Sequence, residues 1–116
     1  MDKKLGLSAE KGILGRVVDL AGLVDYQADA VVSKTLVKKK AGTVTLFAFD
    51  KGQGLSEHTA PYDAMALVID GEVDITVSGN TKRVKKGEMI IMPANEPHEL
   101  MGVERFKMVL VMVRSD

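Results

Sequence analysis

The sequence predicts an all-β domain, built as a sandwich or a barrel. Short apolar runs recur along the chain, and turn-forming residues such as Gly, Asn and Asp separate them at close spacing. One run alternates strictly, because Val73, Ile75 and Val77 are apolar while the residues between them are polar. This alternation is typical of a strand with one buried face.

The first thirty residues differ from the rest of the chain. Residues 1–11 are polar and predict a loose tail. Residues 16–19 are predicted to form a short strand and residues 20–24 a single helical turn, since several glycines argue against one long helix. We therefore expect residues 1–30 to form an N-terminal segment that packs on the β-domain, and residues 31–116 to form that domain.

The remaining apolar runs predict the strands of the domain. These cover residues 31–37, 43–49, 65–69, 72–77, 81–84, 88–92 and 106–114. Asp70-Gly71 lies between two of the runs and predicts a tight hairpin turn, because Gly adopts a positive φ without a steric clash.

Three of the predicted strands are apolar on both faces: residues 43–49, 65–69 and 106–113. A lone antiparallel barrel keeps one face polar. Something must therefore cover the outer face of these strands, and the choices are the N-terminal segment, a second sheet or a second subunit.

Composition narrows the functional classes. The 116 residues suit one domain with its own core, and the absence of cysteine excludes disulfides and a thiol nucleophile and fits a cytoplasmic protein. The 16 Lys and Arg residues balance 16 Asp and Glu residues, so no basic excess favours nucleic acid. No apolar run is long enough to span a membrane, and the N-terminus lacks the apolar core of a signal peptide.

Two stretches share an order of glycine, proline and histidine. Residues 52–71 read GQGLSEHTAPYDAMALVIDG, and residues 87–98 read GEMIIMPANEPH. In both, a glycine opens the stretch. In the first a histidine precedes a proline and a strand, and in the second a strand and a proline precede a histidine.

These stretches resemble the two motifs of the cupin family of small β-barrels. The positions that match are Gly52, His58 and Gly71 in the first motif, and Gly87, Pro93 and His98 in the second. The resemblance covers about residues 35–114 and implies a jelly-roll-like antiparallel β-barrel. Because small cupins are usually dimers, it also implies a homodimer.

The sequence departs from the cupin pattern at four positions. Ala60 and Ala64 stand where the family carries a metal-binding His and Glu, Asn95 replaces a Gly, and Gly102 replaces an Asn. The change at Asn95 is mild, because Asn tolerates a left-handed backbone. The two alanines remove two of the four side chains that hold the metal in most cupin enzymes.

His58 and His98 are the only histidines, and the resemblance places both at metal-ligand positions inside the barrel mouth. Imidazole is a common transition-metal ligand, so the pair is expected to bind one divalent iron, manganese, nickel, copper or zinc ion. Metal sites normally use three protein ligands or more. Asp63 is the candidate third ligand, although a one-residue shift turns a strand side chain to the other face. Tyr62 is the candidate ligand or proton donor.

The same positions predict an apolar pocket. Ala60 and Ala64 would widen the barrel mouth, and Ala66 and Val68 share the strand face of Ala64 and should point the same way. The chain is also rich in methionine, which we expect to fill the core and a dimer interface. A concave apolar pocket with two histidines at its mouth is the default small-molecule site. The histidines would then be neutral, hydrogen-bonded pocket residues.

Three functions are open at this point. The first is a binding module that takes a small, largely apolar or sugar-like molecule without turnover, and the missing ligands at Ala60 and Ala64 favour it. The second is a metal-dependent dioxygenase or isomerase that uses His58 and His98, completed by Asp63 or water. The third is a structural or regulatory dimer with a filled barrel.

Overall fold

The computed structural model describes residues 12–115. The loose tail predicted at residues 1–11 lies outside the described residues. Within them, a 3-10 helix at Leu20–Leu23 precedes nine strands. The strands are β1 (Val31–Lys39), β2 (Gly42–Phe49), β3 (Gly54–His58), β4 (Tyr62–Asp70), β5 (Glu72–Val77), β6 (Asn80–Lys85), β7 (Met89–Met92), β8 (His98–Gly102) and β9 (Phe106–Arg114).

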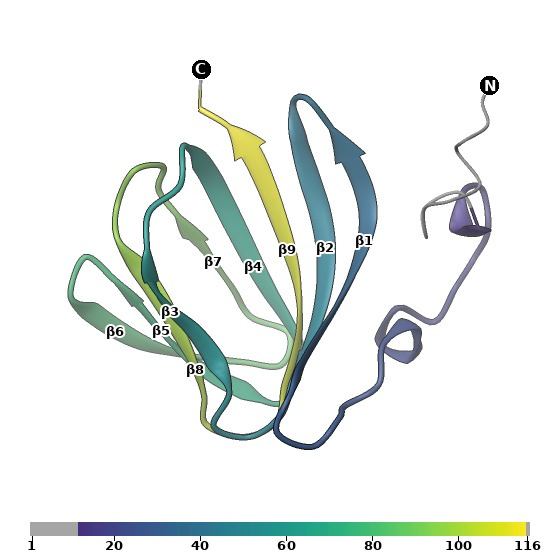
Figure 1. Ribbon diagram of the computed structural model, residues 1–116, viewed down its shortest axis with the longest axis horizontal. Helices are drawn as coiled ribbons and strands as arrows, with labels where there is room; N and C mark the ends of the chain where they lie inside the picture. The colour runs from purple at the N-terminus through teal and green to yellow at the C-terminus, as the bar shows by residue number, and fades with distance from the viewer. Residues whose placement is uncertain (1–11, 116) are drawn as a thin grey trace.

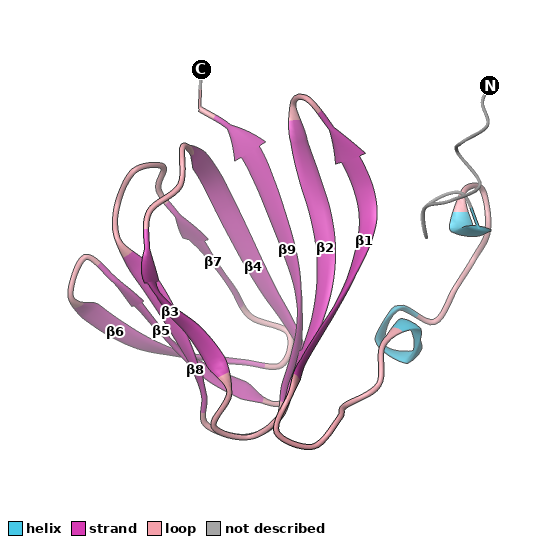
Figure 2. Ribbon diagram, in the orientation of Figure 1, coloured by secondary structure: helices cyan, strands magenta, loops and turns pink. Residues whose placement is uncertain are grey.

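The strands form two antiparallel sheets that face each other (Figures 1 and 2). One sheet has the order β1-β2-β9-β4-β7 and the other the order β3-β8-β5-β6. Consecutive strands repeatedly pass from one sheet to the other, and Figure 1 shows the sheets meeting at one end and splaying apart at the other. The predicted all-β, jelly-roll-like architecture is confirmed.

Several element predictions need correction. Residues 16–19 belong to no strand, so the strand predicted there is wrong. The strands β3 and β8 were not predicted, because β3 has a polar, exposed second half and β8 alternates over only five residues. In contrast, β5 and β9 have the predicted bounds.

The turn at Asp70-Gly71 is a corner between the sheets. The predicted hairpin is wrong, because β4 pairs with β7 and β9, whereas β5 pairs with β6 and β8. Gly71 nevertheless has the expected positive φ, at 73°. A Cβ atom at this position would lie 2.0 Å from the carbonyl oxygen of Arg105, so only glycine fits the corner.

The core lies between the sheets. Its centre is a stacked aromatic pair, Phe49 and Phe106, whose ring centroids are 4.4 Å apart and whose side chains are wholly buried. Around the pair lie the inward-facing residues of β4, β5 and β9. This cluster fills the space between the two sheets.

A second apolar cluster covers the outer face of the five-stranded sheet. Val24 of the N-terminal segment packs with Leu46, Ala48 and Val109 of that face. Over the described residues, the N-terminal segment therefore covers the face that the sequence left unexplained. The homodimer stays a prediction.

Polar contacts hold this segment in place. The hydroxyl of Tyr26 donates to Oδ2 of Asp70 at 2.5 Å, and Nζ of Lys107 donates to the carbonyl of Ala21 at 2.6 Å. The guanidinium of Arg105 lies 4.2 Å from the centre of the Tyr26 ring. Burial, together with the hydrogen bond to Asp70, raises the pKa of Tyr26. No helix among the described residues is long and apolar enough to cross a membrane.

The corner at Gly71 gives a direct test of the fold. Gly71→Ala should lower the free energy of unfolding by about 3 kcal/mol or more, because the methyl group adds a backbone clash to the cost of positive φ. Gly79→Ala is the matched control, since Gly79 has a φ of 83° and open space around its Cβ position. The control should lose only about 1 kcal/mol. Equal losses in urea unfolding would contradict the close approach at the corner.

Candidate functional site

A β-bulge in β3 positions the site. Leu55 pairs with Leu100 and His58 pairs with His98, so three steps along β3 match two steps along β8. Without the extra residue, Leu55 and His58 would face opposite sides of the sheet, because side chains alternate along a strand. The bulge lets both side chains line the same pocket.

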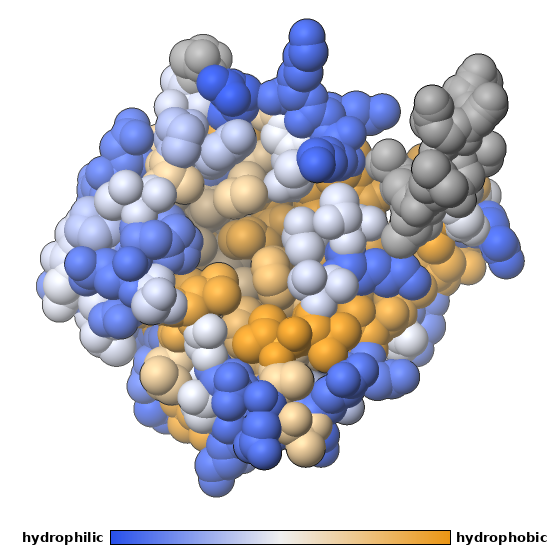
Figure 3. Space-filling view, viewed as in Figure 1, coloured by the Kyte–Doolittle hydropathy of each residue, from blue (hydrophilic) through white to orange (hydrophobic). Residues whose placement is uncertain are grey.

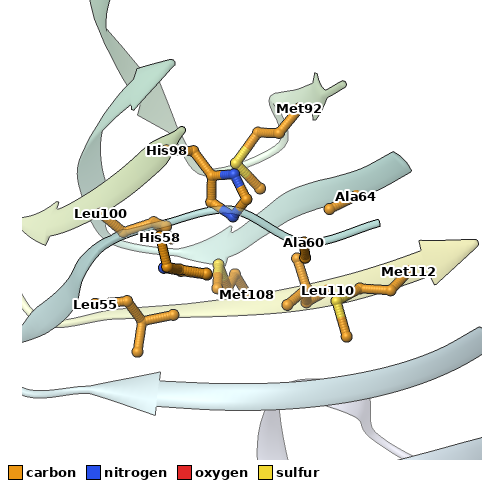
Figure 4. A pocket seen from close by; sticks show the side chains of 10 residues that line it. All are labelled: Leu55, His58, Ala60, Ala64, Met92, His98, Leu100, Met108, Leu110 and Met112. Carbon is orange, nitrogen blue, oxygen red and sulfur yellow. The ribbon is translucent and has the colours of Figure 1, made fainter. Parts of the chain in front are cut away.

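The pocket is a small apolar hollow between the sheets. Its ten lining residues are Leu55, His58, Ala60, Ala64, Met92, His98, Leu100, Met108, Leu110 and Met112 (Figure 4). Figure 3 shows apolar surface gathered at the centre of this view of the molecule, with polar residues around it. The space open to the centre of a water molecule is about 30 Å³, and the hollow that includes its solvent-open mouth is about 340 Å³.

The predicted pocket residues divide into two groups. His58, Ala60, Ala64 and His98 line the hollow. Ala66 and Val68 share the inward face of β4 but are wholly buried in the core and lie outside the lining. They pack the barrel beneath the pocket.

The two histidines are directly in contact. They are register partners on β3 and β8, and their ring centroids lie 4.4 Å apart with an interplanar angle of 67°. His58 is exposed at the mouth, whereas His98 retains only 6% of its accessible surface. The pair therefore joins the solvent-facing rim to the buried part of the pocket.

Backbone hydrogen bonds fix the tautomer of each ring. Nδ1 of His58 lies 2.7 Å from the carbonyl oxygen of Ser56, and Nδ1 of His98 lies 3.1 Å from that of Glu96. A carbonyl oxygen only accepts, so the neutral ring must carry its proton on Nδ1. Each Nε2 then keeps a free lone pair, and this is the arrangement that metal-binding histidines commonly show.

His98 is held in its neutral form. Burial lowers its pKa, and the neighbouring His58 lowers it further, although the hydrogen bond to Glu96 opposes the shift. At neutral pH the buried Nε2 is therefore an acceptor or a ligand, and His98 carries no charge.

Tyr62 and Asp63 contact residues outside the pocket lining. Asp63 is exposed, and its Oδ1 accepts a hydrogen bond from the backbone amide of Ala94 at 3.0 Å. The ring of Tyr62 lies 5.7 Å from the guanidinium carbon of Arg114. Neither residue is among those that line the pocket.

The usual cupin metal set does not fit this site. Ala60 and Ala64 offer no donor atoms, and the acidic neighbours Glu57 and Glu99 are exposed. Within residues 12–115, no group of three or more His, Cys, Asp or Glu side chains could hold a metal ion. A divalent ion bound by three histidines and a carboxylate therefore has no counterpart here.

The sequence analysis missed the methionines of the pocket. Met92 and Met108 fill the core as expected, with Met112 packed against it, but the sequence did not predict that all three also line the hollow. Met92 and Met112 are the register partners of Ala64 on its two sides. The four-residue spacing of Met108 and Met112 hinted at a shared face of β9, but strand order decides what that face touches.

Comparisons with known proteins agree with this architecture. The family described as "Cupin domain" matches residues 45–113. A conserved protein of unknown function from Streptococcus pyogenes is 40% identical, with a TM-score of 0.84, over 88% of this chain and 90% of that chain. A cupin superfamily protein from Desulfitobacterium hafniense is 27% identical, with a TM-score of 0.83, over 87% and 93% of the two chains. No protein of curated function matches the chain.

The neutral state of His98 predicts a pH dependence of stability in metal-free protein. The folded pKa is lowered, so the unfolded chain binds a proton at His98 more readily than the folded protein does. This contribution to stability is complete above about pH 6.5 and is lost as the pH falls through the lower folded pKa. Urea unfolding midpoints should fall with pH by less in His98→Gln than in the wild type.

An NMR titration provides a second measurement that does not need the variant to fold. The Cε1 proton of His98 should titrate below pH 6.5, the usual histidine value. A midpoint at or above that value would show that the ring is not desolvated as the structure implies.

Proposed function

Because the chain belongs to the cupin family, we propose that its barrel is a binding module, which holds a small ligand at Nε2 of His58 and His98 without turnover. One observation carries this proposal. Among the ten lining residues, the two imidazoles are the only polar side chains. The ligand must therefore present an electron-pair acceptor to the histidines and an apolar surface to the rest of the pocket.

The composition of the lining favours binding over catalysis. No carboxylate, hydroxyl or amine lines the pocket beside the histidines, so the site lacks a second group to move a proton between substrate and solvent. A sugar-like ligand is also disfavoured, because its many hydroxyls would lose water without finding partners.

Pocket size limits what can enter. The inner space of about 30 Å³ holds an ion or one small polar group. Typical small-molecule pockets measure about 300 Å³ or more. A larger ligand would keep its apolar body at the mouth, beside the exposed His58, and insert only its acceptor group.

The metal-dependent dioxygenase or isomerase is the second candidate. It is favoured by the retention of both histidines at cupin ligand positions and by their contact at 4.4 Å between ring centroids. It would require a proton-transfer group from outside the lining, and Tyr62 is the candidate that the sequence offers. Turnover of a substrate that appears only after metal loading would favour the enzyme over the binding module.

A pair of matched probes tests the binding module. Phenol can donate a hydrogen bond to Nε2, whereas anisole has a similar ring and no donor. Wild-type protein should bind phenol more strongly than anisole in ligand-observed NMR. His58→Phe keeps a planar ring but removes the Nε2 acceptor. It should weaken the binding of phenol by about tenfold, which corresponds to the loss of one hydrogen bond.

Glu57→Gln serves as the control, because Glu57 is the exposed neighbour of His58 and does not line the pocket. It should bind both probes as the wild type does. Equal binding of phenol and anisole, or phenol binding that survives His58→Phe, would show that the histidines do not hold the ligand.

A further inference from the structure

Within residues 12–115 the two sheets have four edge strands, and three of these are protected against pairing with another chain. The edges are β1 and β7 in one sheet and β3 and β6 in the other (Figure 1). Strand β1 carries three lysines, β6 carries two lysines and an arginine, and β3 has a bulge and a polar second half. Charges and bulges are the devices that keep natural edge strands unpaired. Strand β7, with the sequence MIIM, has neither.

The open edge of β7 offers backbone hydrogen-bonding groups. Directly before β7, the carbonyl of Glu88 accepts a hydrogen bond from the amide of Val68 on β4 at 2.9 Å. Bonded and non-bonded pairs alternate along an antiparallel ladder, so every second residue after Glu88 bonds to β4. The residues between them, Met89 and Ile91, therefore point their amides and carbonyls toward the open edge.

The side chains of β7 face two different surfaces. Met89 and Ile91 lie on the outer face of the sheet, where 44% and 57% of their surface is exposed. Ile90 faces the space between the sheets, because it pairs with the wholly buried Ala66. A segment paired with β7 follows the same alternation. Its residues opposite Met89 and Ile91 meet apolar side chains, and the residue between them turns inward.

On that inward side, a groove runs between β7 and β6. Two open cavities of about 390 and 360 Å³ lie along it, and Lys82 and Ile90 line both. Lys82 turns inward because it pairs with the buried Ile75 of β5. Its ammonium group makes no ion pair within the described part of the chain, whereas Glu88 and Glu96, which also line the groove, already accept hydrogen bonds within the protein. A carboxylate that enters the groove therefore complements Lys82.

We propose that the edge of β7 binds an extended segment of a partner protein, in which one acidic residue lies between two apolar residues. The segment adds an antiparallel strand to the five-stranded sheet. Its backbone pairs with Met89 and Ile91, its apolar side chains extend the outer face, and its carboxylate pairs with Lys82. The groove shares no lining residue with the barrel pocket, so this proposal goes beyond the binding module and is tested separately.

Synthetic peptides test the edge. The probe is the pentapeptide Thr-Val-Glu-Val-Thr, acetylated and amidated at its ends and added to ¹⁵N-labelled protein. At a peptide concentration about ten times its dissociation constant, the exchange of the Met89 and Ile91 amide protons with solvent should slow by about tenfold. N-methylation of both valines removes the donors that face β7 and keeps the side chains. It should weaken binding by about tenfold or more.

Lys82→Gln tests the charge, and a peptide with Gln in place of Glu is the matched probe. Wild-type protein should prefer the Glu peptide by about two- to fivefold, the range of an exposed ion pair. Lys82→Gln should lose this preference. Lys38→Gln removes an exposed lysine from the opposite edge strand, β1, and should keep it.

Three results would overturn the proposal. The first is no binding of the Glu peptide, and the second is equal binding of its N-methylated form. The third is protection of the Met89 and Ile91 amides before any peptide is added, because the edge would then already be paired with a second copy of the chain. A preference for the Glu peptide that survives Lys82→Gln would overturn the acidic residue assigned to the segment.

Discussion

The bulge in β3 is the constraint on which the site depends. It shifts the register by one residue between Leu55 and His58, so that His58 comes to face His98 instead of the opposite side of the sheet. Close approach of the strands is required as well, because a Cβ atom on Gly54 would lie 1.9 Å from the carbonyl oxygen of Leu100. Remove either feature and the two imidazoles separate.

The second motif completes this arrangement from the other strand. Asn95 has a φ of 66°, as expected for an Asn at a glycine position of the family, and its amide donates to the carbonyl of Ala60 at 2.8 Å. The loop before β8 is thereby tied to the loop after β3. Glu96 then presents its carbonyl to Nδ1 of His98, which leaves Nε2 for the pocket.

Substitution of the family's His and Glu by Ala60 and Ala64 changes the chemistry more than the shape. The barrel and the histidine pair persist, while no carboxylate is among the residues that line the pocket. An apolar site without a carboxylate penalises divalent ions strongly. These departures from the family pattern therefore support the proposed binding module.

The sequence predicted the strands that have strong local signals, and it also predicted the two motif histidines as site residues. The alternation in β5 and the long apolar run of β9 fixed their bounds, and the motif spacing placed His58 and His98 at the mouth, where both line the pocket. The pairing of strands that are far apart in the sequence could not be predicted. The Asp70-Gly71 hairpin was wrong because local turn chemistry does not say which sheet the next strand joins.

The same limit hid the role of the methionines. Met92 and Met112 flank Ala64 only because β4 lies between β7 and β9. No local pattern in the sequence reports that order. A single methionine in a strand is usually interpreted as a core residue. Its place in the pocket lining depends on neighbouring strands that are far away in the sequence.

The proposed site requires that both histidines turn an unprotonated Nε2 toward the pocket. Long-range ¹⁵N–¹H NMR of the imidazole rings in metal-free protein, at a pH where both rings are neutral, measures this directly. The structure predicts the Nδ1–H tautomer for His58 and for His98, with Nε2 showing the shift of a nitrogen that carries no proton. An Nε2–H tautomer in either ring would mean that its lone pair faces the backbone carbonyl, and the ligand site described here could not form.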